Sequence, residues 1–117
     1  MAPQPEGANE ASGIERRRQP RTSIQLRATV LLPDDQLLMA HTIDLSNGGA
    51  CLSVPAQLVA GDEVRLALQF EAVGIRHNLL LIARVCYCSA QGPVFRAGLQ
   101  FVQIAPEDAA LLGALLA

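Results

Sequence analysis

A chain of 117 residues is long enough for one domain and too short for two domains with full cores. Half of its residues are hydrophobic and 17% are charged, so it can fill a core, yet no apolar run reaches the roughly 18 residues that a membrane span needs. The net charge of −2 argues against a general nucleic-acid coat, because such proteins usually carry a basic excess.

The chain begins with 13 residues rich in Pro, Gly, Ala and polar side chains, and this composition predicts a disordered tail over residues 1–13. One domain is expected over residues 14–117. It opens with a run of arginines, and all nine basic residues of the chain are arginine, which favours planar, bidentate contacts with an anion. Residues 14–21 are expected to be mobile until an anion orders them, because they offer nothing to pack.

Six strands are predicted after the arginine run. Apolar and polar side chains alternate over residues 24–32 and 63–70, with the period of a strand that buries one face. Residues 79–88 are more uniformly apolar, as in a strand covered on both sides. Residues with turn chemistry, mainly Pro, Gly, Asn and Asp, separate these runs. The six predicted strands are residues 24–32, 37–44, 50–54, 63–70, 79–88 and 94–102.

A short helix is predicted at the C-terminus. Pro106, Glu107 and Asp108 place a proline and two acids at a helix N-terminus, and the apolar segment 109–116 follows. Short strands with hairpin-length links favour an all-β fold, a six-stranded antiparallel barrel with this helix closing it, because closure hides strand edges. A β-sandwich is the second choice.

Two motifs stand apart from the core pattern. Arg17 and Arg21 have an RxxxR spacing, and Asp44, Ser46 and Gly49 have a DxSxxG spacing between the second and third predicted strands. A Gly-x-x-Phe strand, GLQF, lies near the end of the chain. Together, in this order and placement, these motifs resemble the PilZ domain family.

The resemblance covers roughly residues 14–116. It implies a PilZ-like barrel with a flexible N-terminal arm that binds cyclic di-GMP, a bacterial second messenger with two guanines and two phosphates. In PilZ-like sites the motif arginines, here Arg17 and Arg21, contact guanine and phosphate, while Arg16 and Arg18 are expected to add charge or to hold a second ligand copy. The chemistry agrees, because guanidinium forks bond bidentately to a phosphate or to the O6/N7 edge of guanine.

Other residues of the predicted site have two interpretations each. Asp44 is expected to accept hydrogen bonds from guanine N1–H and N2–H₂, Ser46 to supply a small hydroxyl, and Gly49 to let the backbone approach the ligand or adopt a positive φ. Alternatively, the acid and the serine merely cap backbone N–H groups of a hairpin. Arg84 is expected to stack on a base, as long side chains do in PilZ-like sites, or else to end in a surface ion pair. Arg96 is a similar but poorer candidate.

No metal site and no catalytic group are predicted. His41 and His77 lack Cys, Asp or Glu neighbours at metal-ligand spacing. Cys86 and Cys88, two apart on a strand, are expected to face the same side as small buried hydrophobes. Three cysteines without a CxxC pair, and the lack of a leader sequence, favour a reducing cytoplasm.

The expected function is a cytoplasmic receptor or adaptor, not an enzyme and without a cofactor, that changes its conformation or its protein partner on binding cyclic di-GMP. The identity of that partner and the existence of a homodimer are left open, and no DNA, RNA or membrane partner is expected. Two alternatives remain. One is a PilZ-fold protein-interaction module that does not bind nucleotide, and the other is a barrel that uses the arginine arm as a nucleic-acid clamp.

Overall fold

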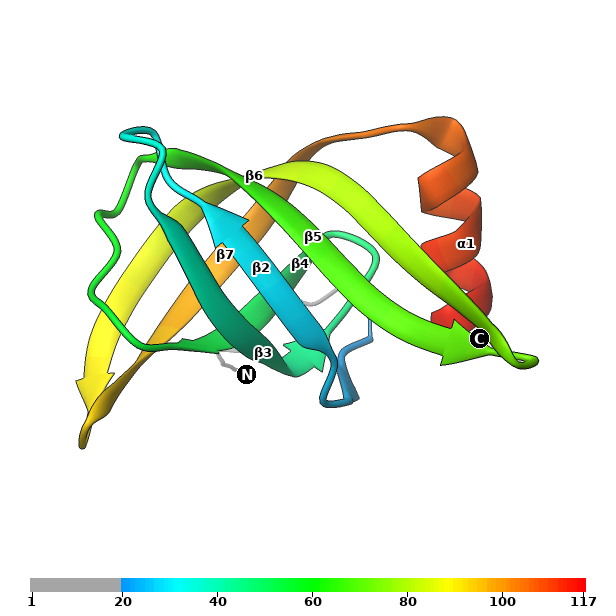
Figure 1. Ribbon diagram of the computed structural model, residues 1–117, viewed down its shortest axis with the longest axis horizontal. Helices are drawn as coiled ribbons and strands as arrows, with labels where there is room; N and C mark the ends of the chain where they lie inside the picture. The colour runs from blue at the N-terminus through cyan, green and yellow to red at the C-terminus, as the bar shows by residue number, and fades with distance from the viewer. Residues whose placement is uncertain (1–19) are drawn as a thin grey trace, which may run out of the picture.

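The computed structural model describes residues 20–117, which form seven strands and one helix (Figure 1). Each of the six predicted strands has a counterpart, and a two-residue strand precedes them. The elements are β1 Thr22–Ser23, β2 Arg27–Leu31, β3 Leu37–Leu45, β4 Gly49–Val54, β5 Glu63–Ala72, β6 Ile75–Gln91, β7 Val94–Ile104 and α1 Pro106–Leu116.

The sheet closes on itself. Its strands follow the order β3-β2-β5-β6-β7-β4, the pairing of β3 with β4 completes the circle, and every neighbouring pair is antiparallel. The predicted six-stranded antiparallel barrel is therefore confirmed. Closure gives each of these strands a partner on both sides, so their backbone donors and acceptors are satisfied within the protein.

Strand β1 pairs with the end of β3 and was not predicted as a separate element. Between β1 and β2 the chain leaves the regular ladder and bonds to the buried side chain of Thr42. The Leu26 amide donates to Thr42 Oγ1 at 2.8 Å, and the Thr42 hydroxyl donates to the Ile24 carbonyl. The predicted strand over residues 24–32 therefore begins three residues later, at Arg27, and ends one residue earlier, at Leu31, because the Thr42 hydroxyl bonds to the backbone of Ile24 and Leu26 in place of a regular ladder.

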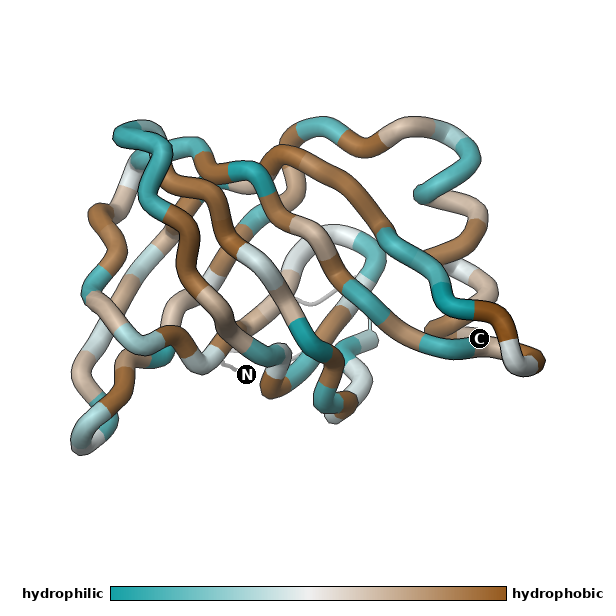
Figure 2. Tube along the Cα trace, viewed as in Figure 1, coloured by the Kyte–Doolittle hydropathy of each residue, from teal (hydrophilic) through white to brown (hydrophobic). Residues whose placement is uncertain are grey.

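The core fills the barrel with aliphatic side chains, which alternate with more exposed ones along β2, β5 and most of β3, whereas β4 is buried at nearly every position. Figure 2 shows this alternation as brown and teal segments along the barrel wall. Burial of each leucine or valine contributes roughly 1.5–3 kcal/mol relative to exposure. The largest fully buried side chains are Leu45, Leu52, Leu66, Leu68, Leu79, Leu112, Val30, Val54, Val64, Val85 and Thr42.

The β5–β6 hairpin is longer than predicted and reaches past the barrel beside α1 (Figure 1). Its turn is Val73-Gly74, and both residues have positive φ, 52° and 74°. Two positive-φ residues in a two-residue loop match the twist of paired strands. Residues 71–78 lack the alternation expected of a strand, and Val73 is 98% exposed, so the sequence pattern did not reveal this extension.

Two β-bulges at one end of the barrel change which side chains face outward. In β3 the register with β4 shifts between Thr42 and Asp44, and in β6 the register with β7 shifts between Val85 and Tyr87. Each bulge adds one residue and reverses the in–out alternation beyond it. As a result Val85 is buried, while Tyr87, two residues further on, is 48% exposed.

The second bulge also corrects the expectation for two cysteines. Cys86 is the extra residue and is exposed, whereas Cys88 is half-buried and packs against the core. The prediction that both face the same side as buried hydrophobes was wrong, since strict alternation does not hold across a bulge.

Helix α1 packs against β6, and its Leu112 belongs to the core. Over residues 20–117 it is the single helix, and its 11 residues do not meet the length and hydropathy of a membrane-crossing helix.

Candidate functional site

The DxSxxG motif forms the tight turn between β3 and β4, and Ser46 holds that turn together. Its Oγ accepts hydrogen bonds from the backbone amides of Gly48 and Gly49, both at 3.2 Å, and its own amide donates to the Gly49 carbonyl at 2.9 Å. The side chain is buried. Ser46 therefore shapes the turn through side chain–backbone bonds, which is the capping role weighed from the sequence.

Glycine is required at position 49 because of the neighbouring strand β7. A Cβ at this position would overlap the carbonyl oxygen of Leu99 on β7, with which the turn is in close contact. Its φ lies outside the left-handed region that glycine favours. The positive φ considered from the sequence is thus not adopted, and the glycine serves a close approach of two backbones.

Arg21 reaches the motif because β1 pairs with the end of β3. Ser23 lies opposite Asp44 in that ladder, and the Arg21 Nη1 lies 2.8 Å from the Asp44 Oδ1. The two side chains are 35% and 27% exposed. A partly exposed pair of this kind contributes little to stability, about 0–1 kcal/mol. Its effect is positional, since the carboxylate fixes the last arginine of the RxxxR spacing beside the DxSxxG turn.

Tyr87 and Phe101 are the aromatic residues of this region, and sequence reasoning did not select Tyr87. Its ring lies directly on Gly98 of β7, where a Cβ would overlap the ring. Its hydroxyl is 3.7 Å from the thiol sulfur of Cys51. Partial burial, followed by the hydrogen bond and charge interaction with Cys51, raises the pKa of Tyr87, and the nearby Arg96 and Arg21 charges oppose that rise. The phenol is therefore neutral near neutral pH.

Arg21, the DxSxxG turn and Tyr87 line an open hollow of about 600 Å³, which Asp44 itself does not line. This volume is within the usual 300–1,000 Å³ range of small-molecule sites. The hollow combines a cation, a backbone turn, two aromatic residues and an amide on one surface. Its lining residues are Arg21, Ser46, Gly48, Gly49, Cys51, Cys86, Tyr87, Gly98, Leu99, Gln100 and Phe101.

The structure brings some predicted site residues to this hollow and leaves others away from it. Arg84 does not line the hollow, and its Nη2 lies 3.3 Å from Glu63 Oε2 in a surface ion pair. Arg96 lies on β7 opposite Ser89 of β6, near enough to Tyr87 for its charge to lower that pKa. The predicted residues Arg16, Arg17 and Arg18, and the predicted tail over residues 1–13, lie outside the described residues.

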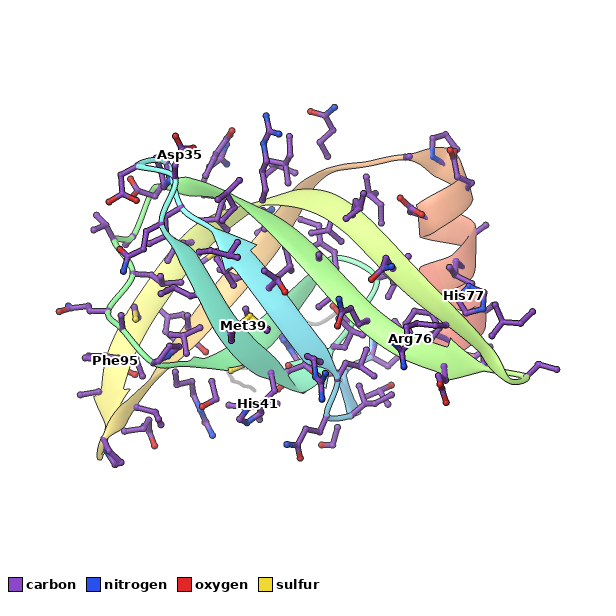
Figure 3. All side chains as sticks on the ribbon, viewed as in Figure 1. Asp35, Met39, His41, Arg76, His77 and Phe95 are labelled. Atoms are coloured by element: carbon purple, nitrogen blue, oxygen red, sulfur yellow. The ribbon has the colours of Figure 1, made fainter. Side chains whose placement is uncertain are left out.

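The histidines belong to other parts of the barrel. His77 stacks on Phe70 with ring centroids 5.3 Å apart on the β5–β6 hairpin, and His41 is on β3 (Figure 3). Among residues 20–117, no three His, Cys, Asp or Glu side chains lie close enough to hold a metal ion.

The family follows from comparison of the whole sequence with family models. The PilZ domain model matches residues 15–117, which is almost the entire chain described above. This chain belongs to the PilZ domain family. The resemblance inferred from the RxxxR and DxSxxG motifs is therefore confirmed, although no curated protein sequence matches the chain significantly.

Solved structures share the PilZ fold. The Bacillus subtilis inhibitor of motility, MotI/DgrA, has 18% identity and a TM-score of 0.75, covering 85% of this chain and 48% of its own. Escherichia coli YcgR in complex with c-di-GMP has 22% identity and a TM-score of 0.71, covering 86% of this chain and 44% of its own. The PilZ domain of YcgR with c-di-GMP has 20% identity and a TM-score of 0.71, with 86% and 88% coverage. The chain thus spans about half the length of the first two proteins.

Proposed function

We propose that this PilZ domain is a receptor for cyclic di-GMP that acts without enzymatic activity, by changing its conformation or its protein partner when the dinucleotide binds. One observation carries the proposal. Arg21 of the RxxxR motif is in contact with Asp44 of the DxSxxG motif, at the edge of an open hollow with an aromatic ring. Two motifs 23 residues apart in sequence therefore form one surface.

The polar roles follow from the chemistry of guanine and phosphate. The Arg21 guanidinium forms bidentate bonds to a phosphate or to the O6/N7 edge of a guanine. The Asp44 carboxylate, which has acceptor oxygens only, accepts from the N1–H and N2–H₂ groups of a guanine. In the free protein these two side chains bond to each other, and this contact supports the proposal because side chains that are held in place before binding lose less ordering entropy on binding.

Tyr87 supplies the stacking surface that the sequence led us to expect from Arg84. One face of its ring lies on Gly98, and the residue is 48% exposed, so a guanine has access to the other face. Stacking on an aromatic side chain contributes about 1–3 kcal/mol per base. Arg96 adds positive charge near this ring and favours a ligand with two phosphates.

The arginine arm completes the proposed site. Arg17 is proposed as the second motif arginine on the ligand, and Arg16 and Arg18 add charge or hold a second ligand copy. Charge-assisted hydrogen bonds of about 1.5–3 kcal/mol each offset the roughly 1–2 kcal/mol per residue that ordering a backbone costs. Docking of the arm is then the event that a protein partner reads, and the cytoplasm, where cyclic di-GMP acts as a second messenger, is the proposed location.

Isothermal titration calorimetry of the 117-residue chain with cyclic di-GMP tests this proposal. Micromolar or tighter binding is expected, and Arg21→Ala should weaken it by about one to two powers of ten. Arg76→Ala is the matched control, because Arg76 is an exposed arginine on the β5–β6 hairpin whose nearest acid is Glu71 at 3.9 Å. No heat of binding at tens of micromolar protein, or equal affinity of the Arg21 and Arg76 variants, would reject the assignment. Equal affinity for a single-stranded oligonucleotide, with a steep salt dependence, would favour the nucleic-acid clamp instead.

A further inference from the structure

Helix α1 has an unusual composition for a helix on the surface of a small barrel. After Asp108 it contains only alanine, leucine and glycine, so it is apolar on every side. A helix that is apolar all round is normally buried. Here only Leu112 is buried, while the alanines at 109, 110 and 114 are exposed. One side of α1 therefore lacks a covering partner among the described residues.

A second uncovered apolar surface lies on the outer wall of the barrel. Leu37, Met39 and Leu80 are 58%, 60% and 62% exposed, and they come from β3 and β6. Cross-strand register connects them through the intervening strands, because Met39 lies opposite Thr29 and Leu80 lies opposite Ala67. Figure 3 shows Met39 on the wall that faces the viewer. The result is a largely apolar face across β3, β2, β5 and β6, interrupted by Thr29, which we call the outer face.

The outer face contains a hollow of about 670 Å³, and α1 borders it. Leu31, Leu37, Leu80 and Ile82 line it, and so does Asp108 from the first turn of α1. It shares no lining residue with the hollow at the DxSxxG turn. The two uncovered apolar surfaces are therefore neighbours, and both are separate from the candidate ligand site.

Charge and size indicate what covers the outer face. Arg65 is the cation of this hollow, and neither Arg65 nor Asp108 forms an ion pair with another described residue. The first turn of α1 carries two acids, Glu107 and Asp108. With its 11 residues α1 is about 16 Å long, and four neighbouring strands span about 14 Å. An apolar helix with an acidic start thus matches an apolar hollow with a cation.

We propose that the partner of the outer face is a second copy of this chain, in a two-fold dimer where α1 of each copy lies in the hollow of the other. Because α1 borders the hollow of its own chain, a two-fold axis that passes beside Asp108 places the α1 of each copy in the hollow of the other copy. In such an isologous interface each contact between two residues occurs twice, once on each side of the two-fold axis. Arg65 of one copy meets Glu107 or Asp108 of the other, and the exposed alanines of α1 are covered by Leu37 and Leu80. The ligand hollow stays open in this dimer, so the inference does not depend on the proposed function.

Sedimentation velocity of the 117-residue chain, without ligand, tests the dimer. The parent chain is expected to show a reversible monomer–dimer equilibrium at tens of micromolar. Arg65→Glu and Asp108→Arg should each weaken association by at least about tenfold, because each places like charges opposite one another. The double variant, with both charges reversed, should recover most of the parent affinity. Arg84→Glu is the control, because Arg84 is an exposed arginine that does not line the hollow of the outer face, and this variant should leave association unchanged.

Circular dichroism of each variant separates loss of association from loss of folding. Leu80→Lys gives a second route, since this exposed position tolerates a charge in the monomer but places it against α1 in the dimer. A chain that stays monomeric up to about 200 µM would overturn the proposal and leave the outer face to residues 1–19 or to another protein. A dimer that tolerates both single reversals, or a folded double variant no stronger than the single variants, would also overturn it.

Discussion

The Tyr87 ring offers the sharpest test of the proposed ligand site, because no motif includes this residue. One face of the ring is covered by Gly98, so only one base has access to it. The expected contribution is that of one stacked base, about 1–3 kcal/mol. Tyr87→Ala should therefore weaken cyclic di-GMP binding by about 5- to 150-fold. Tyr87→Phe keeps the ring and loses only the 3.7 Å contact with Cys51, so its affinity should stay within about threefold of the parent.

The assay combines calorimetry with the emission of the protein itself. The chain has one tyrosine and no tryptophan, so its intrinsic fluorescence comes from Tyr87 alone. Stacking of a guanine on the ring should quench this emission in step with the calorimetric binding curve. A folded Tyr87→Ala variant with affinity within about twofold of the parent would refute the stacking argument. A Tyr87→Phe variant as weak as Tyr87→Ala would assign the effect to the hydroxyl instead.

Three further predictions concern glycine and turn positions of the backbone and the pKa of Tyr87. Gly49→Ala should lower the free energy of unfolding by about 1–3 kcal/mol in urea denaturation, because the added Cβ overlaps the β7 backbone. Gly113→Ala in α1 should instead raise the free energy of unfolding by about 0.5–1 kcal/mol, because this position has room for a Cβ. The phenolate absorbance of Tyr87 should appear with a pKa above the usual value of about 10, and Arg96→Ala should raise that pKa further. Because the raised pKa favours the protonated form in the folded state, its stabilising effect is complete below about pH 10 and is lost as the pH rises through the raised pKa. Val73→Asn should stabilise the protein by about 1 kcal/mol in thermal unfolding, since asparagine tolerates the φ of 52° that valine adopts there under strain, and an unchanged or lower Tm would contradict this.

The sequence predicted the barrel because its information is local and periodic. Alternation over residues 63–70 and the turn residues between strands determine which side chains are buried and where the chain reverses. Extra residues in paired strands are not visible in such a pattern. The bulge before Asp44 turns that carboxylate outward toward Arg21, and the bulge at Cys86 exposes Tyr87. The register of a strand depends on its partner strand, so the pattern of residues along one strand does not reveal it.

The two motifs led to part of the candidate hollow. RxxxR and DxSxxG selected Arg21, Ser46 and Gly49, which line the hollow. The role of Gly49 could not be read from the sequence, since it depends on a carbonyl 50 residues further along the chain. Arg84 was expected from the resemblance to stack on a base, with a surface ion pair as the alternative, and its pairing with Glu63 became visible only when β5 was placed beside β6.

The single extra residue in β6 makes the outward position of Tyr87 depend on strand length as well as on residue type. Insertion of one codon between those of Gly98 and Leu99 would give Cys86 a partner on β7, restore regular pairing there and turn the Tyr87 side chain toward the barrel interior. Both RxxxR and DxSxxG would remain in the gene, and a search by these two motifs would still accept the product. The stacking surface proposed for a base would therefore be lost by a change in strand length alone.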